Sequence, residues 1–284
     1  MSTLEEYQAA GQELYDKLRL YTYPVAVKFI KSESEIPSNI MRPSKNNEMI
    51  PLCRAFTWAR RWKAHVAMTR EDNACITSSC ILKWYDPEEV PPEEVVKGTT
   101  RSGYRIDIEA EKRVRNLWDR YIDKNMDKVK DHMGFIVSPL NETIIIPDSI
   151  LIYGDPNQIM HIIHSISYEG KILVESYFAG YSETCNKGVL IPYITGKPQV
   201  VLPGTGDRRL SFTTENEMAI GIPGDLIFKV NEHMFVSGGP RNNMGQPNKV
   251  VMQGLPKSYS PPAWKHLRRV VKRNKKKGLI KKKG

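Results

Sequence analysis

The sequence predicts a mixed α/β fold of the α+β kind, on two observations. Short apolar runs rich in β-branched residues alternate with longer stretches of helical periodicity, a pattern typical of helices packed on a sheet. The order strand, helix, short strand and cysteine-bearing loop also occurs twice, ending at Cys75 and at Cys185. The repetition predicts two halves, 1–130 and 131–236, related by a pseudo-twofold duplication. Reuse of a common α/β unit without duplication is the alternative.

The first half begins with a predicted helix and a buried strand. Thr3 and Glu6 form a capping box, and apolar residues then recur at helical spacing as far as Leu18. Pro24 opens a β-branched and aromatic run that predicts a strand over 24–30. The other elements predicted here are a polar connection over 31–51, a helix over 53–64, a short strand over 65–69 and the loop that carries Cys75.

The second half begins after a predicted surface excursion over 86–103, where "DPEEVPPEEV" lies. Charge pairs four residues apart favour a helix over 108–130. Asp155 and Pro156 predict the start of a helix that ends at Gly170. The other predicted elements are strands over 134–140 and 148–154, short strands over 171–178, 199–202 and 217–222, a helix over 223–230, and an irregular C-terminal segment from 237.

The net charge of +10 is concentrated at the C-terminus. Residues 265–284 hold eight lysines, three arginines and no acid, whereas the other 264 residues hold 31 basic and 32 acidic side chains. A block of like charge repels itself. We therefore expect one compact domain over 1–264 and a basic, disordered tail over 265–284. The alternative for the tail is contact with a polyanion, namely RNA, membrane phosphates or an acidic partner.

Two features predict a cytoplasmic protein. No apolar run approaches the roughly 18 residues that a membrane-spanning helix requires. The start, "MSTLEEYQAAGQEL", is acidic and polar where a secretory signal is basic and then apolar. Because cytosolic thiols are normally reduced, the cysteines indicate metal binding or catalysis rather than disulfides.

The cysteines are unevenly spread. Cys53, Cys75 and Cys80 share one short stretch, and Cys185 follows over a hundred residues after Cys80. If the two halves face each other across a pseudo-twofold axis, Cys75 and Cys185 are expected to be spatial neighbours.

Several segments occur in an order that resembles a known family. They are "YPVAVKF", "LCRAFTWAR", "PDSILIYGDPNQIMHII", "ETC", "PGTGDRR" and "ENEMAIGIP", spread over roughly residues 10–235. Together they resemble the prokaryotic family called domain of unknown function 169. The resemblance implies an often anaerobic setting, no settled activity, and cysteine at Cys53, Cys75 and Cys185. Cys80 departs from the family's glycine-rich "CPGG", because this chain has "CITSSC".

Cysteine thiolates hold iron–sulfur clusters, and four of them close a 4Fe–4S cubane. Three thiolates leave one iron open as a Lewis acid for a substrate oxygen. We therefore expect a 4Fe–4S cluster on Cys53, Cys75 and Cys185, with Cys80 as a candidate fourth ligand. Zinc, a redox or nucleophilic thiol without metal, and ordinary core cysteines remain open, since neither ferredoxin nor zinc-ribbon spacing is present.

Four other side chains are candidates for the same site. Arg54 adjoins Cys53 in sequence and is predicted to bind an anionic substrate. Asp207 and Arg208 are predicted to be a substrate- or proton-handling pair, with a structural salt bridge as the alternative. His65 is a candidate acid or base, although a histidine in a strand-like run is more often structural.

Arg60 and Arg61 also follow Cys53, and we expect both on the solvated face of their helix. Taken together, the residues predict an iron–sulfur lyase or oxidoreductase of anaerobic metabolism. It would act on a small anionic substrate by hydration, elimination or reduction, either as a monomer or as a homo-oligomer. The alternative is a non-catalytic protein that binds a small molecule or a partner, with structural cysteines or zinc.

Overall fold

The computed structural model describes residues 2–234, 236–237 and 262–277. The chain divides into two compact units, Met1–Gly238 and Gly239–Gly284. The boundary predicted after residue 264 therefore falls inside the second unit. The irregular segment predicted from 237 lies almost entirely outside the described residues.

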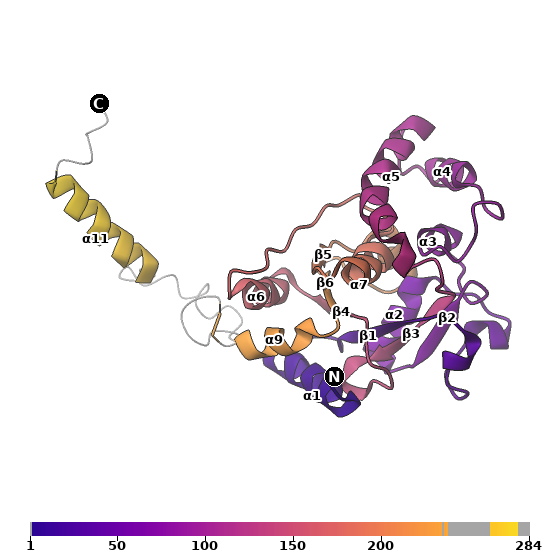
Figure 1. Ribbon diagram of the computed structural model, residues 1–284, viewed down its shortest axis with the longest axis horizontal. Helices are drawn as coiled ribbons and strands as arrows, with labels where there is room; N and C mark the ends of the chain where they lie inside the picture. Colours follow the sequence, from indigo (N-terminus) through magenta and orange to yellow (C-terminus); the bar gives the residue numbers. More distant parts are fainter. Residues whose placement is uncertain (1, 235, 238–261, 278–284) are drawn as a thin grey trace. The chain divides into compact units, whose positions relative to one another are not determined.

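The first unit is a mixed α/β structure, which confirms the predicted fold class (Figure 1). Its strands are β1 (Val25–Ile30), β2 (Val66–Thr69), β3 (Gly134–Pro139), β4 (Ser149–Gly154), β5 (Gln199–Val201) and β6 (Met218–Pro223). Its longer helices are α1 (Leu4–Leu18), α2 (Leu52–Trp62), α4 (Pro92–Arg101), α5 (Ile108–Ile122), α6 (Pro156–Ser167) and α9 (Leu226–His233). Shorter helical segments are α3 (Ile76–Ile81), the π-helix η5 (Thr184–Leu190), α7 (Ile191–Thr195), α8 (Thr205–Leu210) and the 3₁₀ turns η1 (Glu33–Glu35), η2 (Pro43–Asn46), η3 (Asp123–Lys128) and η4 (Leu140–Glu142).

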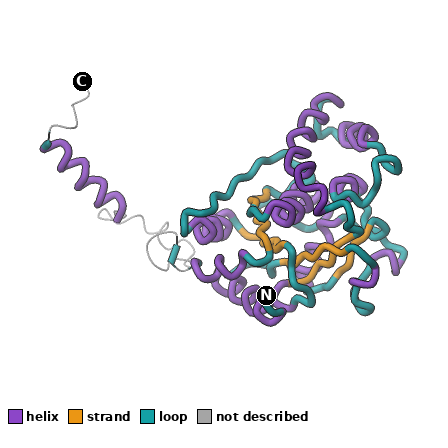
Figure 2. The backbone as a smooth tube through the Cα atoms, viewed as in Figure 1, coloured by secondary structure: helices purple, strands orange, loops and turns teal. Residues whose placement is uncertain are grey.

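The six strands form one sheet in the order β2-β3-β1-β4-β6-β5, and every neighbouring pair is antiparallel. All residues of β3 and β4 are buried, as expected when both faces of a sheet are covered. Helices α1, α6 and α9 pack together on one face, whereas α2, η5 and α7 cover the other. Figure 2 shows the strands between these two helical layers. Helices α3, α4 and α5 extend the second layer outward, next to η5 and α7.

Two predicted elements were wrong. The expected surface excursion contains helix α4, which starts with Pro92 in its first turn and buries Val95 and Val96. Proline is tolerated there because its missing N–H has no partner in the first turn. The strand expected over 171–178 is absent from the described sheet. The segment instead runs beside the edge strand β5 without a ladder, and its Ser176 hydroxyl donates to Val200 O at 2.8 Å.

The described part of the second unit is helix α11 (Pro262–Lys276). It includes much of the tail that we expected to be disordered. Alanine, leucine, arginine and lysine favour helix, and the first glycine after Pro262 is Gly278, which explains why like charge did not prevent a helix here. None of the helices in the described ranges combines the length and apolar character of a transmembrane span. The pseudo-twofold duplication stays a prediction.

Candidate functional site

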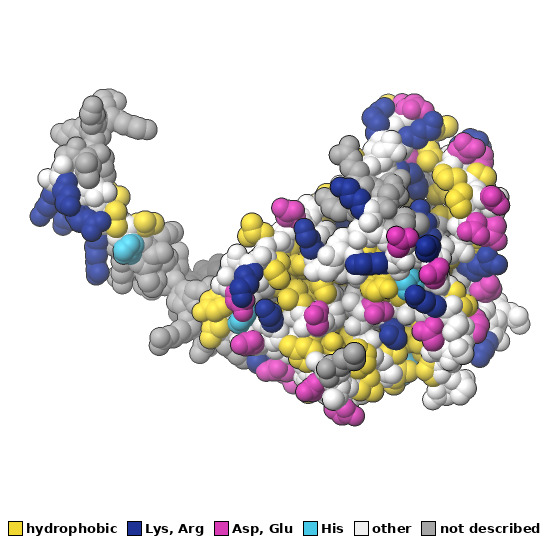
Figure 3. Space-filling view, in the orientation of Figure 1, with side chains coloured by type: hydrophobic (Ala, Val, Ile, Leu, Met, Phe, Trp, Pro, Cys, Tyr) yellow, Lys and Arg dark blue, Asp and Glu magenta, His cyan; other side chains and the backbone are white. Residues whose placement is uncertain are grey.

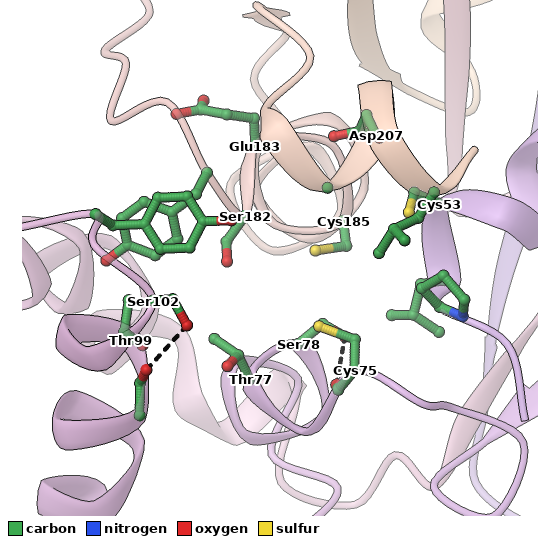
Figure 4. Close-up of a pocket in the computed structure, with 17 residues that line it drawn as sticks. Cys53, Cys75, Thr77, Ser78, Thr99, Ser102, Ser182, Glu183, Cys185 and Asp207 are labelled. Atoms are coloured by element: carbon green, nitrogen blue, oxygen red, sulfur yellow. Dashed lines mark hydrogen bonds between the residues drawn. The ribbon is translucent and has the colours of Figure 1, made fainter. Parts of the chain in front are cut away.

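A cavity of about 400 Å³ lies between α2, α3, α4, η5 and α8 in the first unit. Seventeen residues line it, and they include Cys53, Cys75, Cys185 and Asp207. Figure 4 shows the three cysteines around one open space, with Cys75 on the side facing Cys53, Cys185 and Asp207. Ligand sites usually measure about 300–1,000 Å³, so the cavity has room for a cofactor or a small molecule.

Backbone hydrogen bonds bring Cys53 next to Cys75. Ile50 forms an isolated parallel bridge with Asn73, in which the Ile50 N–H donates to Asp72 O at 2.9 Å and the Ala74 N–H donates to Ile50 O at 3.1 Å. The bridge fixes the chain just before α2, and Cys53 follows in the first turn of that helix. The buried Asn73 side chain accepts the Cys75 N–H at 3.0 Å and donates to Cys75 O at 3.0 Å.

A second set of contacts brings Cys185 next to Asp207. The Thr205 N–H donates to Gly180 O at 3.2 Å, which joins the first turn of α8 to the loop before η5. Gly204 allows this approach, because a Cβ there would lie 2.9 Å from Gly180 O. Helix α2 completes the enclosure, since Arg54 Nε donates to Leu210 O at 3.0 Å at the end of α8.

Burial controls the charge state of the Cys53 and Cys185 thiols. It raises the pKa of Cys53, and the nearby Asp207 carboxylate adds to this effect. It also raises the pKa of Cys185 well above the usual value, with further contributions from Cys75, Asp207 and Cys53. Buried thiols that stay protonated are poor nucleophiles. A bound metal centre would bind them as thiolates by displacing their protons.

Asp207 is the buried carboxylic acid of this cavity wall. Its side chain is 5% exposed, and burial raises its pKa to about 6. The Thr184 hydroxyl, the Gly204 N–H and the charge of Arg60 offset part of that rise. Oδ2 accepts the Gly204 N–H at 3.2 Å, whereas Oδ1 has no hydrogen bond of standard geometry to the described residues.

The far wall of the cavity is rich in hydroxyl groups and aromatic rings. Tyr104 and Tyr181 stack with their ring centroids 4.7 Å apart. The hydroxyl-bearing residues on this side are Thr77, Thr99, Ser102 and Ser182. Sequence reasoning missed this wall, because Thr99 and Ser102 belong to the stretch expected to be a surface excursion. The signal that was available is the polar run "GYSETC" directly before Cys185.

Glu183 and Lys187 were also missed. Both side chains are fully buried and form an ion pair at 2.6 Å, which joins the residue just before the π-helix η5 to Lys187 within it. Glu183 Oε1 accepts the N–H groups of Ala179 at 2.6 Å and Gly180 at 2.8 Å. π-Helices are rare and occur frequently at functional sites. Here the pair joins η5 to the loop that contacts α8.

The other predicted site residues do not line the cavity. Cys80 lies in α3 outside the lining, and burial raises its pKa. His65 is half-buried and hydrogen-bonds through Nδ1 to Ser138 Oγ at 2.7 Å, and burial lowers its pKa. Arg208 donates to the carbonyls of Thr214 and Glu217 and forms no salt bridge with Asp207 in the described structure. Arg54 is held at Leu210 O, as above.

Arg60 corrects the expectation of a solvated face. Its side chain is fully buried, donates to the Glu217 carboxylate and lies 4.0 Å over the Tyr153 ring. A buried guanidinium needs such a partner, because an unpaired buried charge is very costly. Arg61 is partly exposed, as expected, with 31% of its side chain accessible.

The cavity offers soft thiol donors, which suit an iron–sulfur cluster or zinc. Three thiols and two carboxylates, those of Glu183 and Asp207, line one cavity. Among the described residues, however, no group of three or more His, Cys, Asp or Glu is close enough to hold one metal ion.

The comparisons with known proteins identify a family but no activity. The family model DUF169, described as uncharacterised ArCR, matches residues 13–233. An uncharacterised protein of Methanocaldococcus jannaschii is 23% identical over 232 residues, which cover 81% of this chain and 94% of that protein. No solved structure matches the chain. Because the family model spans well over half of the sequence, the chain belongs to the DUF169 family.

Proposed function

We propose that the protein is a 4Fe–4S enzyme whose cluster is held by Cys53, Cys75 and Cys185 in the central cavity. The observation that carries this proposal is the meeting of three thiols from α2, α3 and η5, together with a buried carboxylate, in one cavity. Cys75 and Cys185 are separated by over a hundred residues in the sequence and line the same cavity. A cluster there would supply Lewis-acid or reductive chemistry.

The remaining walls favour a small hydroxyl-bearing substrate. Tyr104 and Tyr181 offer a flat apolar surface, and the serine and threonine hydroxyls beside them can donate or accept hydrogen bonds. The described lining residues include no lysine, arginine or histidine. The lining therefore gives no support to the anionic substrate expected from the sequence. Arg54 and Arg208 do not line the cavity and donate to backbone carbonyls instead.

Iron and sulfide analysis of anaerobically purified full-length protein tests the proposal. We expect about four iron atoms and as many sulfides per chain, with a broad absorbance near ~400 nm. Cys53→Ser, Cys75→Ser and Cys185→Ser should each lose most of the iron. Cys80→Ser is the matched control, because Cys80 lies outside the cavity, and it should keep its iron. Iron-free wild-type protein would rule the proposal out.

The alternative is a non-catalytic protein that binds a small molecule in the same cavity. Cys185 packs against the hydrophobic core, which supports a structural role for that thiol. In this case Cys53→Ser would cost little stability and leave ligand binding intact. A cluster ligand would instead take the cofactor, and often the fold, with it.

We also propose a separate role for the second unit, namely contact with an anionic lipid surface. Helix α11 carries lysine and arginine along one side and apolar residues along another (Figure 3). Leu267 is 57% exposed and Val271 46%, one helical turn apart. Basic amphipathic helices of this kind bind membrane surfaces, whereas RNA contact would not require the apolar side.

A further inference from the structure

The hydroxyl-bearing wall of the cavity includes the last turn of helix α4. Gly98 and Thr99 lie in that turn, Ser102 is the residue that caps it, and all three line the cavity. Figure 4 shows Thr99 and Ser102 on the opposite side of the open space from Cys53 and Asp207. A ligand that fills the cavity would therefore meet this turn at one end and the cysteines at the other.

The hydroxyl protons of this turn are already used. The Thr99 hydroxyl donates to Val95 O at 2.8 Å, and the Ser102 hydroxyl donates to Gly98 O at 3.0 Å. Both partners are carbonyl oxygens, which only accept, so each hydroxyl must be the donor. A hydroxyl group has one proton and two lone pairs. Thr99 and Ser102 can therefore only accept a hydrogen bond from a ligand.

Two more hydroxyls of the lining are committed in the same way. Ser78 donates to Cys75 O at 2.8 Å and accepts from the Asn73 amide at 2.9 Å. The Tyr181 hydroxyl donates to the buried Glu111 carboxylate at 2.5 Å. These hydroxyls have no proton left for a ligand, so this part of the lining favours a ligand that donates.

Electrostatics at the end of α4 favours a positive charge. The C-terminal end of a helix is the negative end of its dipole and stabilises nearby cations. Arg115 donates to Thr99 at 3.0 Å, but its charge is paired with the fully buried Glu111 at 2.7 Å. Arg101, the basic residue of the last turn, is exposed and does not line the cavity. A ligand cation would therefore meet no like charge in the described lining.

We propose that the substrate is a small amino alcohol whose ammonium group binds at the last turn of α4. An ammonium group has three donors and no acceptor, which matches hydroxyls that can only accept. The Tyr104 ring in the same lining adds an aromatic face of the kind that attracts cations. The hydroxyl end would then lie toward the cysteines, where a cluster would bind an oxygen. The assignment rests on the proposed function, which makes this cavity the substrate site.

Three small probes test the assignment on anaerobically purified full-length protein, namely ethanolamine, ethylene glycol and glycolate. All three carry one hydroxymethyl group, and they differ in whether the other end is an ammonium, a hydroxyl or a carboxylate. Isothermal titration calorimetry measures their binding. Ethanolamine should bind about tenfold more tightly than either of the others, because charge-assisted hydrogen bonds are stronger than neutral ones.

Thr99→Val and Thr100→Val are a matched pair of variants. Both threonines donate their hydroxyl to the carbonyl four residues earlier on α4, but only Thr99 lines the cavity. Thr99→Val should weaken ethanolamine binding about tenfold, the usual effect of removing a hydrogen bond to a charged group, and Thr100→Val should leave it unchanged. Ser102→Ala, at an exposed position, should also weaken it and serves as the second variant if Thr99→Val does not fold.

The outcomes separate this assignment from the proposed function. Iron-loaded protein that binds ethylene glycol or glycolate as tightly as ethanolamine, or that binds no ethanolamine, would overturn the assignment and leave the cluster in place. Unchanged ethanolamine binding by Thr99→Val and Ser102→Ala would also overturn it. Iron-free wild-type protein would overturn the proposed function and the assignment together.

Discussion

Arg60 is a fully buried cation on α2, close to the candidate site. It pairs with Glu217, and its charge lowers the pKa of Asp207. Burial tends to raise the pKa of Glu217, but the hydrogen bonds and charge of Arg60 outweigh burial and lower it overall. Arg60, which we expected on the solvated face of its helix, thus lowers the pKa of two buried carboxyl groups.

Arg60→Met should destabilise the protein by about 3–5 kcal/mol, because the buried Glu217 carboxylate loses its main ion-pair partner and keeps only the longer contact with Arg61. The neighbouring Arg61→Met is the control, and it should cost at most ~1 kcal/mol, as exposed ion pairs usually do. Urea unfolding measures both. Adding Glu217→Gln to Arg60→Met should recover part of the loss, and no recovery would contradict the role given to the ion pair.

At the scale of elements, the π-helix η5 reaches the sheet through two glycines. A Cβ at Gly221 of β6 would overlap the carbonyl oxygen of Gly188 in η5. A Cβ at Gly188 would in turn lie 2.7 Å from Leu151 Cδ1 on β4. The backbone of η5 therefore lies directly on β6, and this close contact fixes the height of Cys185 above the sheet.

Gly221→Ala should separate η5 from β6 and cost about 1–3 kcal/mol, the usual penalty of overpacking. Thermal unfolding should show a melting temperature lower by several degrees. Gly98→Ala is the control for stability alone, because nothing lies within 4 Å of a Cβ at this helical position. It should be neutral or stabilising by up to ~1 kcal/mol. Equal melting temperatures for the two variants would argue against the glycine contact.

At the scale of the whole molecule, charge separates the two units. The residues before 265 are nearly neutral, and in Figure 3 acidic and basic side chains are interspersed over the visible face of the first unit. The excess positive charge belongs to the C-terminal segment. An electrostatic partner is therefore expected at the second unit, while the cavity belongs to the first.

Full-length protein should bind vesicles that contain anionic lipid, and binding should weaken as salt rises, since each basic residue near such a surface contributes about 1 kcal/mol. A chain that ends at residue 261 should not bind. Leu267→Ser combined with Val271→Ser keeps the charge and should reduce binding by removing apolar contact. Cosedimentation measures all three proteins, and unchanged binding of the shortened chain would exclude this role for α11.

The sequence by itself determined the class of fold and most elements. The predicted capping box at Thr3 and the Asp155–Pro156 pair begin α1 and α6, and the apolar runs became β1, β3 and β4. These features depend on neighbours a few residues apart, so they are visible in a linear pattern. The tail helix and α4 were missed because like charge and prolines outweighed helix propensity in the prediction.

Only the tertiary structure decided which side chains share the cavity. Cys53, Cys75, Cys185 and Asp207 meet there through the Ile50–Asn73 bridge and the Gly180–Thr205 contact, and His65, Arg54, Arg208 and Cys80 do not line it. The buried state of Arg60 depends on Glu217, 157 residues away. Such pairings carry no local signal, because they follow from the order of strands in the sheet and from the layer that each helix covers.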